Sequence, residues 1–338
     1  MTARAAAQPL AIIGAGSWGT ALAIVLSPRF PRIRLWAHET DLAARMFSTR
    51  VNDIFLPGIA LPLNVEPTAD LGYALEDAGI VVGAMPSRFA RPLYRKMLPH
   101  LAPEMRFVSA TKGLEQGTLL RMSEVARAAI GEKFEPRVAV LSGPTFAREV
   151  ASGEPTAVVI ASGDRELALS IQREFSGPTF RLYVNGDPVG VELGAALKNI
   201  IAIAAGICDG LGLGSNTLAA LITRGLAEIT RLAIALGGHP RTLAGLAGLG
   251  DLVLTCNGDL SRNRSVGIEL AKGRKLADIV ASMTMIAEGV ETTAAACELA
   301  RRCGVDMPIT EQMDAILRGA TSPKDAIREL MERELKAE

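Results

Sequence analysis

Short apolar runs recur along the first half of the chain, separated by stretches with a helical period. The runs are four to six residues long and show no strict alternation of apolar and polar side chains, which is typical of parallel strands buried on both faces. They predict strands at residues 10–14, 33–36, 79–84, 106–109, 138–141, 156–161 and 179–183. Repeated strand–helix units of this kind indicate an α/β fold with a doubly wound parallel sheet.

The pattern changes after Tyr183, because every later segment has only a helical period. Asn185-Gly186 predicts a turn, and Asp187 followed by Pro188 is typical of a helix N-cap with proline at the first helical position. Helices are expected at residues 188–208, 216–236, 240–254, 262–272, 290–303, 309–318 and 323–336. We therefore predict a sheet domain at 1–186 and an all-α C-terminal domain at 187–338.

Composition narrows the class of protein. Of the 338 residues, 49% are hydrophobic, and Lys+Arg and Asp+Glu balance at 36 each, which excludes intrinsic disorder. No run of Lys or Arg exceeds two residues, so we expect no nucleic-acid partner. The longest apolar run, at residues 200–208, is shorter than the roughly 18 residues of a membrane span, so none is predicted. The apolar patch near the N-terminus is too short for a signal peptide, and we interpret it as the first strand.

The cysteines carry little functional signal. Cys208, Cys256, Cys297 and Cys303 show no CxxC spacing, and the chain has only three histidines. No metal site is therefore expected. We expect the cysteines to be buried, reduced thiols of a cytoplasmic protein.

A glycine-rich segment at residues 14–19 fits the pattern GxGxxG, directly after the first predicted strand and directly before a helical run. In a dinucleotide-binding turn, Gly14 would allow the tight turn, Gly16 would let the backbone approach a pyrophosphate, and Gly19 would let the helix pack on the sheet. The helix N-terminus would present free N–H groups to the anion. The segment predicts a Rossmann-like dinucleotide-binding domain at 1–186, the alternative being a glycine turn without a ligand.

The end of the second predicted strand bears on the choice between NAD and NADP. NAD-specific domains usually place an acid there, which accepts hydrogen bonds from the ribose hydroxyls. Here His38 lies 22 residues after Gly16. A histidine could stand beside a 2′-phosphate, whereas the adjacent Glu39 would repel that phosphate. His38 could also be a solvated loop residue, so the sequence leaves the cofactor as NADP or NAD.

Lys198 lies on a helix face that should be buried. Its neighbours three, four and seven positions away are all apolar and mostly small: Val191, Gly194, Ala195, Ile201, Ala202 and Ala205. Burial disfavours the charge of an ammonium group and brings its pKa toward neutrality, which suits a general acid or base. The alternative is a lysine whose charged end reaches solvent at an interdomain edge.

Two further groups of polar residues follow in the helical domain. Asp251 stands in an apolar stretch, and a buried carboxylate needs a partner, for which Lys198 is the candidate. The segment Ser-Arg-Asn-Arg at 261–264 lies at a predicted loop-to-helix junction. An arginine and an amide at a helix start suit a phosphate group, the alternative being a solvated basic turn.

Polar residues also follow two predicted strands of the first domain. Residues 109–114, which include Lys112, follow one strand, and residues 142–147 follow another. The carboxyl ends of the strands form the ligand crevice of open α/β sheets. We expect a ligand site there, although Lys112 alone could equally be a surface charge.

Taken together, these segments resemble the bacterial NAD(P)-dependent glycerol-3-phosphate dehydrogenases. The resemblance covers residues from about 10 to 320 and rests on ordered blocks: GAGSWGTALA at 14–23, FLPG at 55–58, ATKGLE at 110–115, LSGPTFAREV at 141–150, GVELGAALKNIIAIAAGICDGLGLG at 190–214, ALITRGLAEI at 220–229, GLGDLVLTC at 248–256, SRNR at 261–264 and EGVETT at 288–293. The chain departs from the family at Glu39, where many members have arginine, and at Phe55, where tyrosine is common.

The resemblance implies reversible reduction of dihydroxyacetone phosphate to sn-glycerol 3-phosphate, with Lys198 as the proton donor and as the base in reverse. It implies a substrate surrounded by Lys112, Gly143, Thr145, Lys198, Asp251, Ser261, Arg262 and Asn263, the last two on its phosphate. It implies a cofactor site lined by Gly14, Gly16, Ser17, Trp18, Gly19, His38, Lys112, Ala147, Arg262, Ile286 and Glu288. Asn199 and Thr255 are weaker additions near the reactive centre.

The resemblance also implies a cytoplasmic enzyme that supplies glycerol 3-phosphate for phospholipid synthesis, often as a homodimer. Two alternatives remain open. A related two-domain reductase of a 2- or 3-hydroxy acid would not need the SRNR and SGPT segments, which fit a phosphorylated ketone. A non-catalytic dinucleotide sensor would have lost Lys198 or Asp251, and both are present.

Overall fold

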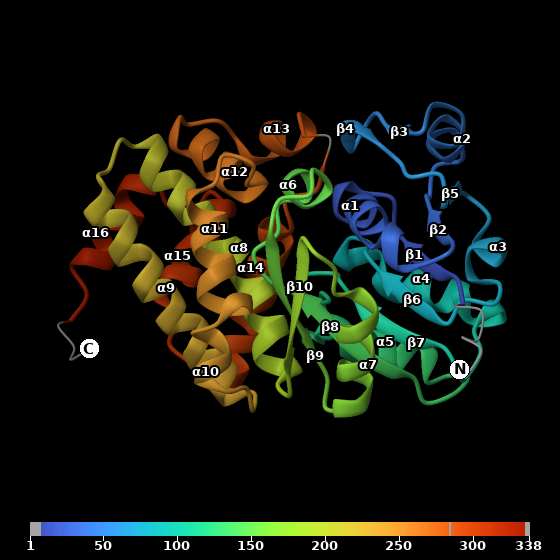
Figure 1. Ribbon diagram of the computed structural model, residues 1–338. Helices are drawn as coiled ribbons and strands as arrows, with labels where there is room; N and C mark the ends of the chain where they lie inside the picture. The colour runs from blue at the N-terminus through green and yellow to red at the C-terminus, as the bar shows by residue number, and fades with distance from the viewer. Residues whose placement is uncertain (1–7, 284, 335–338) are drawn as a thin grey trace.

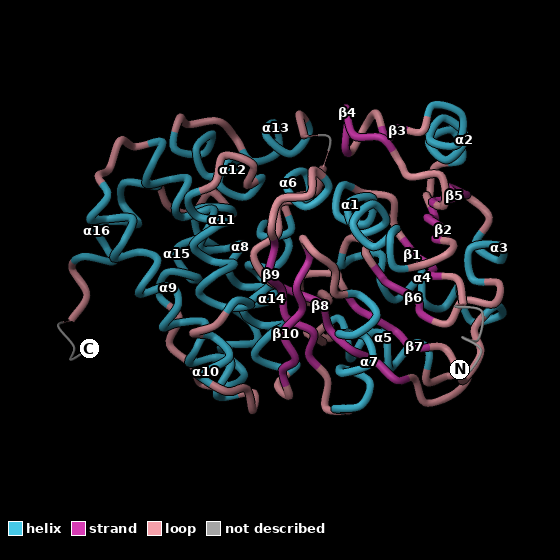
Figure 2. Tube along the Cα trace, viewed as in Figure 1, coloured by secondary structure: helices cyan, strands magenta, loops and turns pink. Residues whose placement is uncertain are grey.

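The computed structural model describes residues 8–283 and 285–334. A sheet covered by helices and a domain made only of helices lie side by side (Figure 1). All the strands lie in one half of the molecule (Figure 2). The outer ends of the two predicted domains, residues 1–7 and 335–338, lie outside the described residues.

The N-terminal domain contains an eight-stranded sheet in the order β10-β9-β8-β7-β6-β1-β2-β5. Its strands are β1 (Leu10–Ile13), β2 (Ile33–Trp36), β5 (Val65–Thr68), β6 (Ile80–Gly83), β7 (Arg106–Ser109), β8 (Arg137–Ser142), β9 (Thr156–Ala161) and β10 (Phe180–Asn185). A separate antiparallel pair joins β3 (Val51–Asn52) to β4 (Leu56–Ala60). All seven predicted strands are confirmed, whereas β3, β4 and β5 were not predicted because they are short and include proline or partly exposed residues.

The expectation of a wholly parallel sheet is wrong at one pair. β8 and β9 run antiparallel, with Leu141 opposite Ile160, while the remaining pairs of this sheet are parallel. The connection between them carries α6 (Ala147–Ala151) and returns the chain into the sheet from the edge at which β8 ends. β10 is consequently an edge strand on which buried and exposed residues alternate at first.

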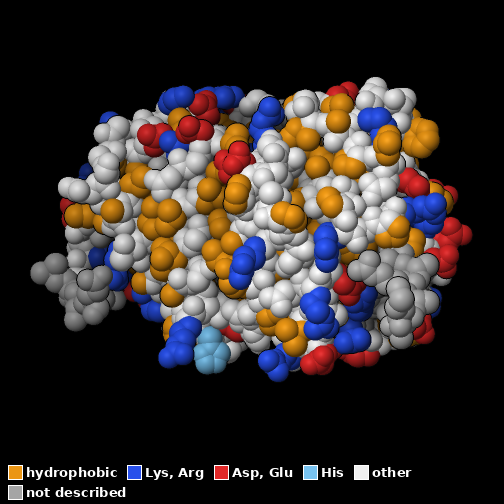
Figure 3. All heavy atoms as spheres, viewed as in Figure 1, with side chains coloured by type: hydrophobic (Ala, Val, Ile, Leu, Met, Phe, Trp, Pro, Cys, Tyr) orange, Lys and Arg blue, Asp and Glu red, His pale blue; other side chains and the backbone are white. Residues whose placement is uncertain are grey.

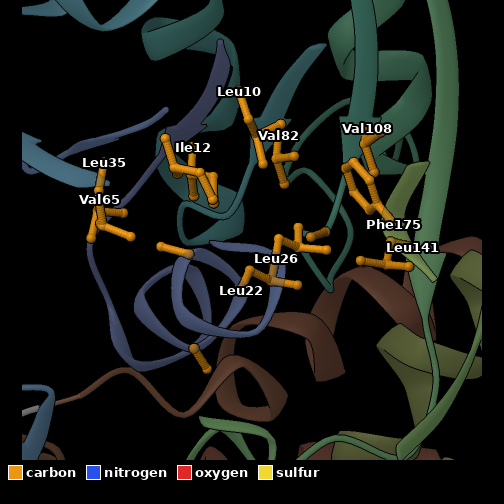
Figure 4. Packing of buried hydrophobic residues seen from close by; sticks show 14 of the residues in the cluster. Leu10, Ile12, Leu22, Leu26, Leu35, Val65, Val82, Val108, Leu141 and Phe175 are labelled. Atoms are coloured by element: carbon orange, nitrogen blue, oxygen red, sulfur yellow. The ribbon is translucent and has the colours of Figure 1, made fainter. Parts of the chain in front are cut away.

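Helices cover both faces of the sheet. They are α1 (Ser17–Leu26), α2 (Thr40–Thr49), α3 (Leu71–Leu75), α4 (Ala90–Met97), α5 (Met122–Ile130) and α7 (Arg165–Phe175), with 3₁₀ turns η1 (Ser27–Arg29), η2 (Ser87–Phe89) and η3 (Leu98–His100). Successive side chains of β1 alternate between two cores: Leu10 and Ile12 pack with Leu22 of α1, and Ala11 and Ile13 pack on the other face (Figure 4). This double burial confirms the doubly wound fold.

The C-terminal domain is built from α8 (Pro188–Gly210), α9 (Ser215–Ala235), α10 (Pro240–Leu243), the π-helical turn η4 (Leu246–Gly250), α11 (Asp251–Asn257), α12 (Arg262–Ala271), α13 (Leu276–Ala281), α14 (Glu288–Cys303), α15 (Pro308–Leu317) and α16 (Pro323–Met331). The single helix expected at 240–254 is wrong, because glycines at 245, 248 and 250 interrupt it. α13 was not predicted. The helix expected at 323–336 ends at Met331, and residues 335–336 lie outside the described residues.

α8 is the central helix of the C-terminal domain, and residues 190–208 are buried without interruption. An 18-residue window of α8 has a mean hydropathy of 1.6, which meets the length and composition of a membrane span. The apolar run considered in the sequence as a membrane-span candidate, residues 200–208, is shorter than this window. The whole window is buried inside the protein, as in the core helix of a globular domain.

The four cysteines are free thiols. Cys208 and Cys256 are buried as predicted, whereas Cys297 and Cys303 are partly exposed, so the expectation of burial is wrong for those two. Both belong to α14, and Cys297 Sγ lies 3.6 Å from the carbonyl oxygen of Thr310 in α15. Within residues 8–283 and 285–334, no three His, Cys, Asp or Glu side chains come together as a metal site.

Candidate active site

Lys198 is buried at the seam between the two domains, with 8% of its side chain exposed. Its Nζ lies 2.5 Å from Oδ1 of Asp251, the first residue of α11, and 2.6 Å from Oγ1 of Thr255, one turn further on. The predicted pairing of Lys198 with Asp251 is confirmed. The alternative of a lysine whose charge reaches solvent is wrong, because the Lys198 side chain is buried and its ammonium group is bonded to Asp251 and Thr255.

The turn before α11 explains how Asp251 reaches Lys198. A Cβ atom added to Gly194 of α8 would lie 2.6 Å from the carbonyl oxygen of Ala247, so η4 packs directly on the α8 backbone. A side chain at Gly248 would collide with the backbone of Leu243. These two glycines let the chain fold tightly enough to bring Asp251 against the middle of α8.

Lys112 adds a second cation from the loop after β7. Its Nζ lies 2.7 Å from Oδ2 of Asp251 and 3.3 Å from the carbonyl oxygen of Gly143, and 18% of its side chain is exposed. Thr145 Oγ1 donates to the same Gly143 oxygen at 3.3 Å. One buried carboxylate thus joins two lysines from different domains, and Lys112 is not merely a surface charge.

The lysine cluster, which we define as Lys112, Lys198, Asp251 and Thr255, has unusual proton chemistry. Burial, the largest cause, lowers the pKa of Lys198 to about 8, and the charge of Lys112 acts in the same direction, while Asp251 opposes them. Thr255 Oγ1 donates to the Asp251 carbonyl oxygen at 2.6 Å and accepts from Lys198. Lys198 is therefore an acid whose proton can leave within about a pH unit of neutrality.

The SRNR segment lies at a helix start, as predicted. Ser261 caps α12, its Oγ accepting from the Arg264 N–H at 3.3 Å. The Asn263 side chain is buried, and its Oδ1 accepts from the N–H of Gly289 at 3.0 Å. The Asn263 amide nitrogen and the first backbone N–H groups of α12 remain as donors for an anion.

The phosphate-binding candidates lie close to α8. A Cβ atom added to Gly289 would lie 2.7 Å from Asn263 Oδ1 and 2.8 Å from the carbonyl oxygen of Asn199. Asn199 follows Lys198 directly, so Gly289 lets α12, α14 and α8 converge beside the lysine cluster. Arg262 is exposed on the same turn as Asn263.

The glycine loop meets the requirements of a dinucleotide site. α1 has no side-chain cap at Gly16, so its first N–H groups are free for an anion, and a Cβ atom added to Gly16 would meet only open space. A side chain at Gly19 would collide with the carbonyl oxygen of Gly14. The indole N–H of Trp18 is buried without a partner in the part of the chain that the structure describes.

The segment before α14 brings the helical domain over the glycine loop. Ser17 Oγ lies 3.5 Å from the sulfur of Met285, and Ile286 follows, partly buried. Glu288 accepts a hydrogen bond of 2.5 Å from Ser87 Oγ and one of 3.3 Å from Ser87 N–H. The segment that holds Ile286 and Glu288 therefore meets the first domain at two places, Ser17 and Ser87, which lie far from it in the sequence.

The remaining cofactor candidates, His38 and Ala147, follow the carboxyl ends of β2 and β8. His38 follows β2 and is exposed, with its ring centroid 6.0 Å from that of Trp36. No contact joins it to the other candidates within the described residues. Ala147 begins α6, which packs against α1.

Sequence reasoning missed Ser87, which binds Glu288 across the seam. Ser87 follows the end of β6, so the rule that singled out the loops after β7 and β8 would have found it. It also ranked Thr255 only as a weaker addition, although this hydroxyl contacts Lys198 directly. Thr255 lies one helical turn from Asp251, a spacing that places both on one face.

Comparison with known proteins gives a consistent result. Two family models match, described as the N-terminus and the C-terminus of NAD-dependent glycerol-3-phosphate dehydrogenase, over residues 9–168 and 187–328. A glycerol-3-phosphate dehydrogenase (NAD(P)+) of Koribacter versatilis is 61% identical over 96% of this chain and 97% of its own length. One of Syntrophotalea carbinolica is 53% identical over 97% and 99%.

A solved structure supports the same grouping. The crystal structure of glycerol-3-phosphate dehydrogenase from Coxiella burnetii is similar with a TM-score of 0.93 and 41% sequence identity. The match covers 97% of this chain and 100% of the other. The likeness therefore extends over both domains and over the seam between them.

Proposed function

The chain belongs to the NAD-dependent glycerol-3-phosphate dehydrogenase family and is an NAD(P)-dependent oxidoreductase, and we propose that Lys198 transfers the proton in its reaction. The reaction interconverts dihydroxyacetone phosphate and sn-glycerol 3-phosphate. Bound NADH or NADPH supplies the hydride that the ketone carbon receives, and the ketone oxygen needs a proton. The observation that carries the proposal is the buried contact of Lys198 with Asp251 and Thr255.

The Lys198 ammonium donates its proton to the ketone oxygen during reduction. One N–H bond breaks as the new O–H bond forms, and the neutral amine is the base that removes the hydroxyl proton in the reverse direction. A pKa of about 8 suits both roles, because the group is protonated at neutral pH and still gives up its proton readily. The ordinary lysine pKa, about 10.4, would make the amine a scarce base.

Asp251 and Lys112 set the charge around the reacting oxygen. Asp251 uses one carboxylate oxygen for each lysine, which keeps Lys198 oriented and favours its charged form. With both lysines protonated, Lys112, Lys198 and Asp251 carry a net charge of +1 in a buried seam. Such preorganised positive charge stabilises the negative charge that develops on the ketone oxygen.

The substrate phosphate is assigned to the start of α12. Arg262 supplies a guanidinium, and Asn263 supplies a side-chain amide fixed by Gly289, beside free backbone N–H groups. Ser261 shapes this turn as its N-cap. Lys112, Gly143 and Thr145 close the opposite side from the carboxyl edge of the sheet.

The cofactor is assigned to the carboxyl edge of β1, β2 and β6. Gly14, Gly16 and Gly19 leave room for the pyrophosphate at the α1 N-terminus, and the unpartnered Trp18 indole N–H is a further donor. The other assigned residues are Ser17, His38, Lys112, Ala147, Arg262, Ile286 and Glu288. The structure favours neither NAD nor NADP.

We also propose a homodimer and a cytoplasmic location. Large hydrophobic side chains lie exposed on the helical domain (Figure 3), among them Ile234, Leu249, Val253 and Leu260. A second copy of the chain would remove them from water. The four free thiols suit a reducing compartment. Light scattering of the purified chain tests the dimer, and a monomer at micromolar concentration would contradict it.

Steady-state kinetics of Lys198→Ala, followed at 340 nm with dihydroxyacetone phosphate, test the assignment. Loss of the proton donor lowers kcat by about 10²- to 10⁴-fold, while the KM for NADH stays nearly unchanged. Lys133→Ala is the control, because Lys133 donates to two backbone carbonyls of the first domain, those of Leu98 and Leu101. A kcat for Lys198→Ala equal to that of the control would contradict the proposed proton transfer by Lys198.

Ketopantoate, in place of dihydroxyacetone phosphate, tests the hydroxy acid alternative. The family match favours the phosphorylated ketone, and it does not favour a non-catalytic sensor. Turnover of ketopantoate with none of dihydroxyacetone phosphate would contradict the proposed substrate.

A further inference from the structure

The loop between β7 and α5 belongs to the first domain by sequence but packs into the second. It begins beside Lys112 and ends at Arg121, and its Leu114 and Leu119 are buried in the hydrophobic core of the helical domain. Leu114 and Arg121 pair as an isolated β-bridge, and Glu115 N–H donates to the Leu120 carbonyl at 2.9 Å. The loop is therefore a closed hairpin-like excursion seated on α8.

Glu192 of α8 anchors the far end of this loop. Its side chain is 4% exposed and accepts three hydrogen bonds from the first domain: 2.7 Å from Ser123 N–H, 2.7 Å from Ser123 Oγ and 2.5 Å from Arg121 Nη1. Ser123 lies in the first turn of α5, so Glu192 satisfies a free N–H of that helix from across the seam. Arg121 is held further by Glu124 at 2.6 Å.

The two lysines of the cluster depend on this geometry because they come from different domains. Lys198 and Glu192 are six residues apart on α8, about 9 Å along a rigid helix axis. The loop is thus attached to the helical domain at both ends: Lys112 meets Asp251 of α11, which also holds Lys198, and Arg121 meets Glu192 of α8. A displacement of the loop end at Arg121 would displace Lys112 relative to Lys198.

We propose that Glu192 is a positioning residue, which holds Arg121 and Ser123 so that the 112–121 loop places Lys112 opposite Lys198. The inference rests on the proposed function of the lysine cluster. Within the described residues the Glu192 carboxylate accepts from Arg121 and Ser123, neither of which is assigned to substrate or cofactor. Its negative charge is buried at the cost of desolvation, which a purely packing role would not require, since apolar side chains fill such space at lower cost.

A second buried acid, Glu228 on α9, offers a matched comparison. It is 2% exposed and also accepts three hydrogen bonds, from Ile309 N–H at 2.7 Å and from Thr310 N–H and Oγ1 at 3.2 Å. All of these lie at the start of α15, within the helical domain. Glu228 therefore shares the burial and bonding of Glu192 and lacks its link to the first domain.

The test compares Glu192→Gln with Glu228→Gln in the full chain, by thermal unfolding and by dihydroxyacetone phosphate reduction from pH 6 to 10. In Glu192→Gln a neutral amide replaces the carboxylate that pairs with Arg121, so the loop end at Arg121 shifts. We expect kcat to fall about 10- to 30-fold, while the KM for NADH stays within about twofold of the wild type. The charge of Lys112 lowers the pKa of Lys198. When Lys112 moves away, the pKa of Lys198 rises, and the pH at which the rate begins to change (the break of the pH profile) moves upward. Glu228→Gln lowers the unfolding temperature and leaves kcat and the break unchanged.

A Glu192→Gln variant with wild-type kcat and an unshifted break would overturn the inference, whatever its unfolding temperature. If Glu192→Gln does not fold, Ser123→Ala removes one donor and keeps the ion pair, and we expect a three- to fivefold lower kcat with the same upward shift. An unchanged profile for Ser123→Ala would then overturn it. Lys198→Ala separates the two proposals: its retained activity contradicts the function assigned to Lys198, whereas normal Glu192→Gln kinetics beside an inactive Lys198→Ala contradict only the role of Glu192.

Discussion

The glycine loop and the lysine cluster, for which we propose cofactor and substrate binding, lie at one seam between the domains and are built in opposite ways. The glycine loop relies on backbone N–H groups and on glycines that lack a side chain, and it consists of six consecutive residues, 14–19. The cluster relies on buried side chains, and its contacts join residues 53 and 139 positions apart. A backbone site carries no net charge to desolvate, whereas a buried charged site is stable only while each charge keeps its partner.

This difference predicts different failures. Changes in the glycine loop should weaken cofactor binding or folding and leave proton chemistry unaltered. Changes in the cluster should alter proton chemistry, because Asp251 raises the pKa of Lys198 and Lys112 lowers it. Variants that separate these two responses test the comparison directly.

Asp251→Asn should have the largest effect. It leaves two buried lysines without their shared carboxylate, so kcat/KM for dihydroxyacetone phosphate falls about 10²- to 10³-fold, about 3–4 kcal/mol. The break of the pH profile moves below 8, because Asp251 raises the pKa of Lys198. Stopped-flow or steady-state assays across pH measure both.

Asp187→Asn is the matched control for Asp251→Asn. Asp187 is also buried at α8, but among the described residues its side chain accepts from backbone N–H groups, those of Gly190 and His239, each at 2.8 Å. Its variant should lose stability and keep kcat within about threefold. Equal kinetic losses in both variants would mean that any buried acid near α8 matters, and the cluster would have no special role.

Gly16→Ala and Gly19→Ala should separate binding from folding at the glycine loop. Gly16 has an ordinary φ of −67° and open space around it, so its variant folds normally but obstructs the pyrophosphate, and the Kd for NADH rises about 30-fold. A Cβ atom at Gly19 overlaps the Gly14 carbonyl, so that variant loses about 2 kcal/mol of unfolding free energy. Fluorescence titration and thermal unfolding distinguish them, and a normal Kd for Gly16→Ala would contradict the assigned site.

The contrast also explains what the sequence could predict. The glycine loop and the burial of Lys198 follow from local patterns, since GxGxxG is contiguous and the neighbours of Lys198 repeat with the helical period. The pairing with Asp251 followed from the general cost of an unpaired buried charge. The residue pattern alone left Lys112 open and only the family resemblance placed it at the site, because the tertiary fold is what brings it to Asp251.

Long-range geometry accounts for the errors. β9 runs antiparallel to β8 because the connection between them enters the sheet at the end where β8 stops. The apolar runs predict where strands lie and not in which direction they run. The interruption at 245–250 looked apolar enough for a continuous helix, although its glycines already weakened that reading. Glu192 was not singled out from the sequence, because its partners Arg121 and Ser123 are about 70 residues earlier in the chain.

The pH dependence of the wild type should follow Lys198. Reduction needs the protonated amine, so kcat/KM is level below pH 8 and falls tenfold per unit above it, while oxidation rises up to about pH 8 and then levels. Both directions, measured with saturating cofactor, report this single group. Reduction that stays constant from pH 7 to 10 would contradict the assignment.

Glu39→Arg should have the smallest effect and concerns only the nucleotide end. Glu39 is exposed after β2, where an arginine can pair with the 2′-phosphate of NADPH, so the ratio of kcat/KM for NADPH to that for NADH rises about tenfold. Glu104→Arg is the control, because it alters the net charge by the same amount. Glu104 is exposed and precedes β7, so it lies at the amino end of the strands, whereas Glu39 follows the carboxyl end of β2. Salt screens charges beyond about 8–10 Å, so Glu104→Arg leaves the ratio unchanged. An equal rise in both variants would mean that the overall charge, and not the residue beside His38, determines the cofactor.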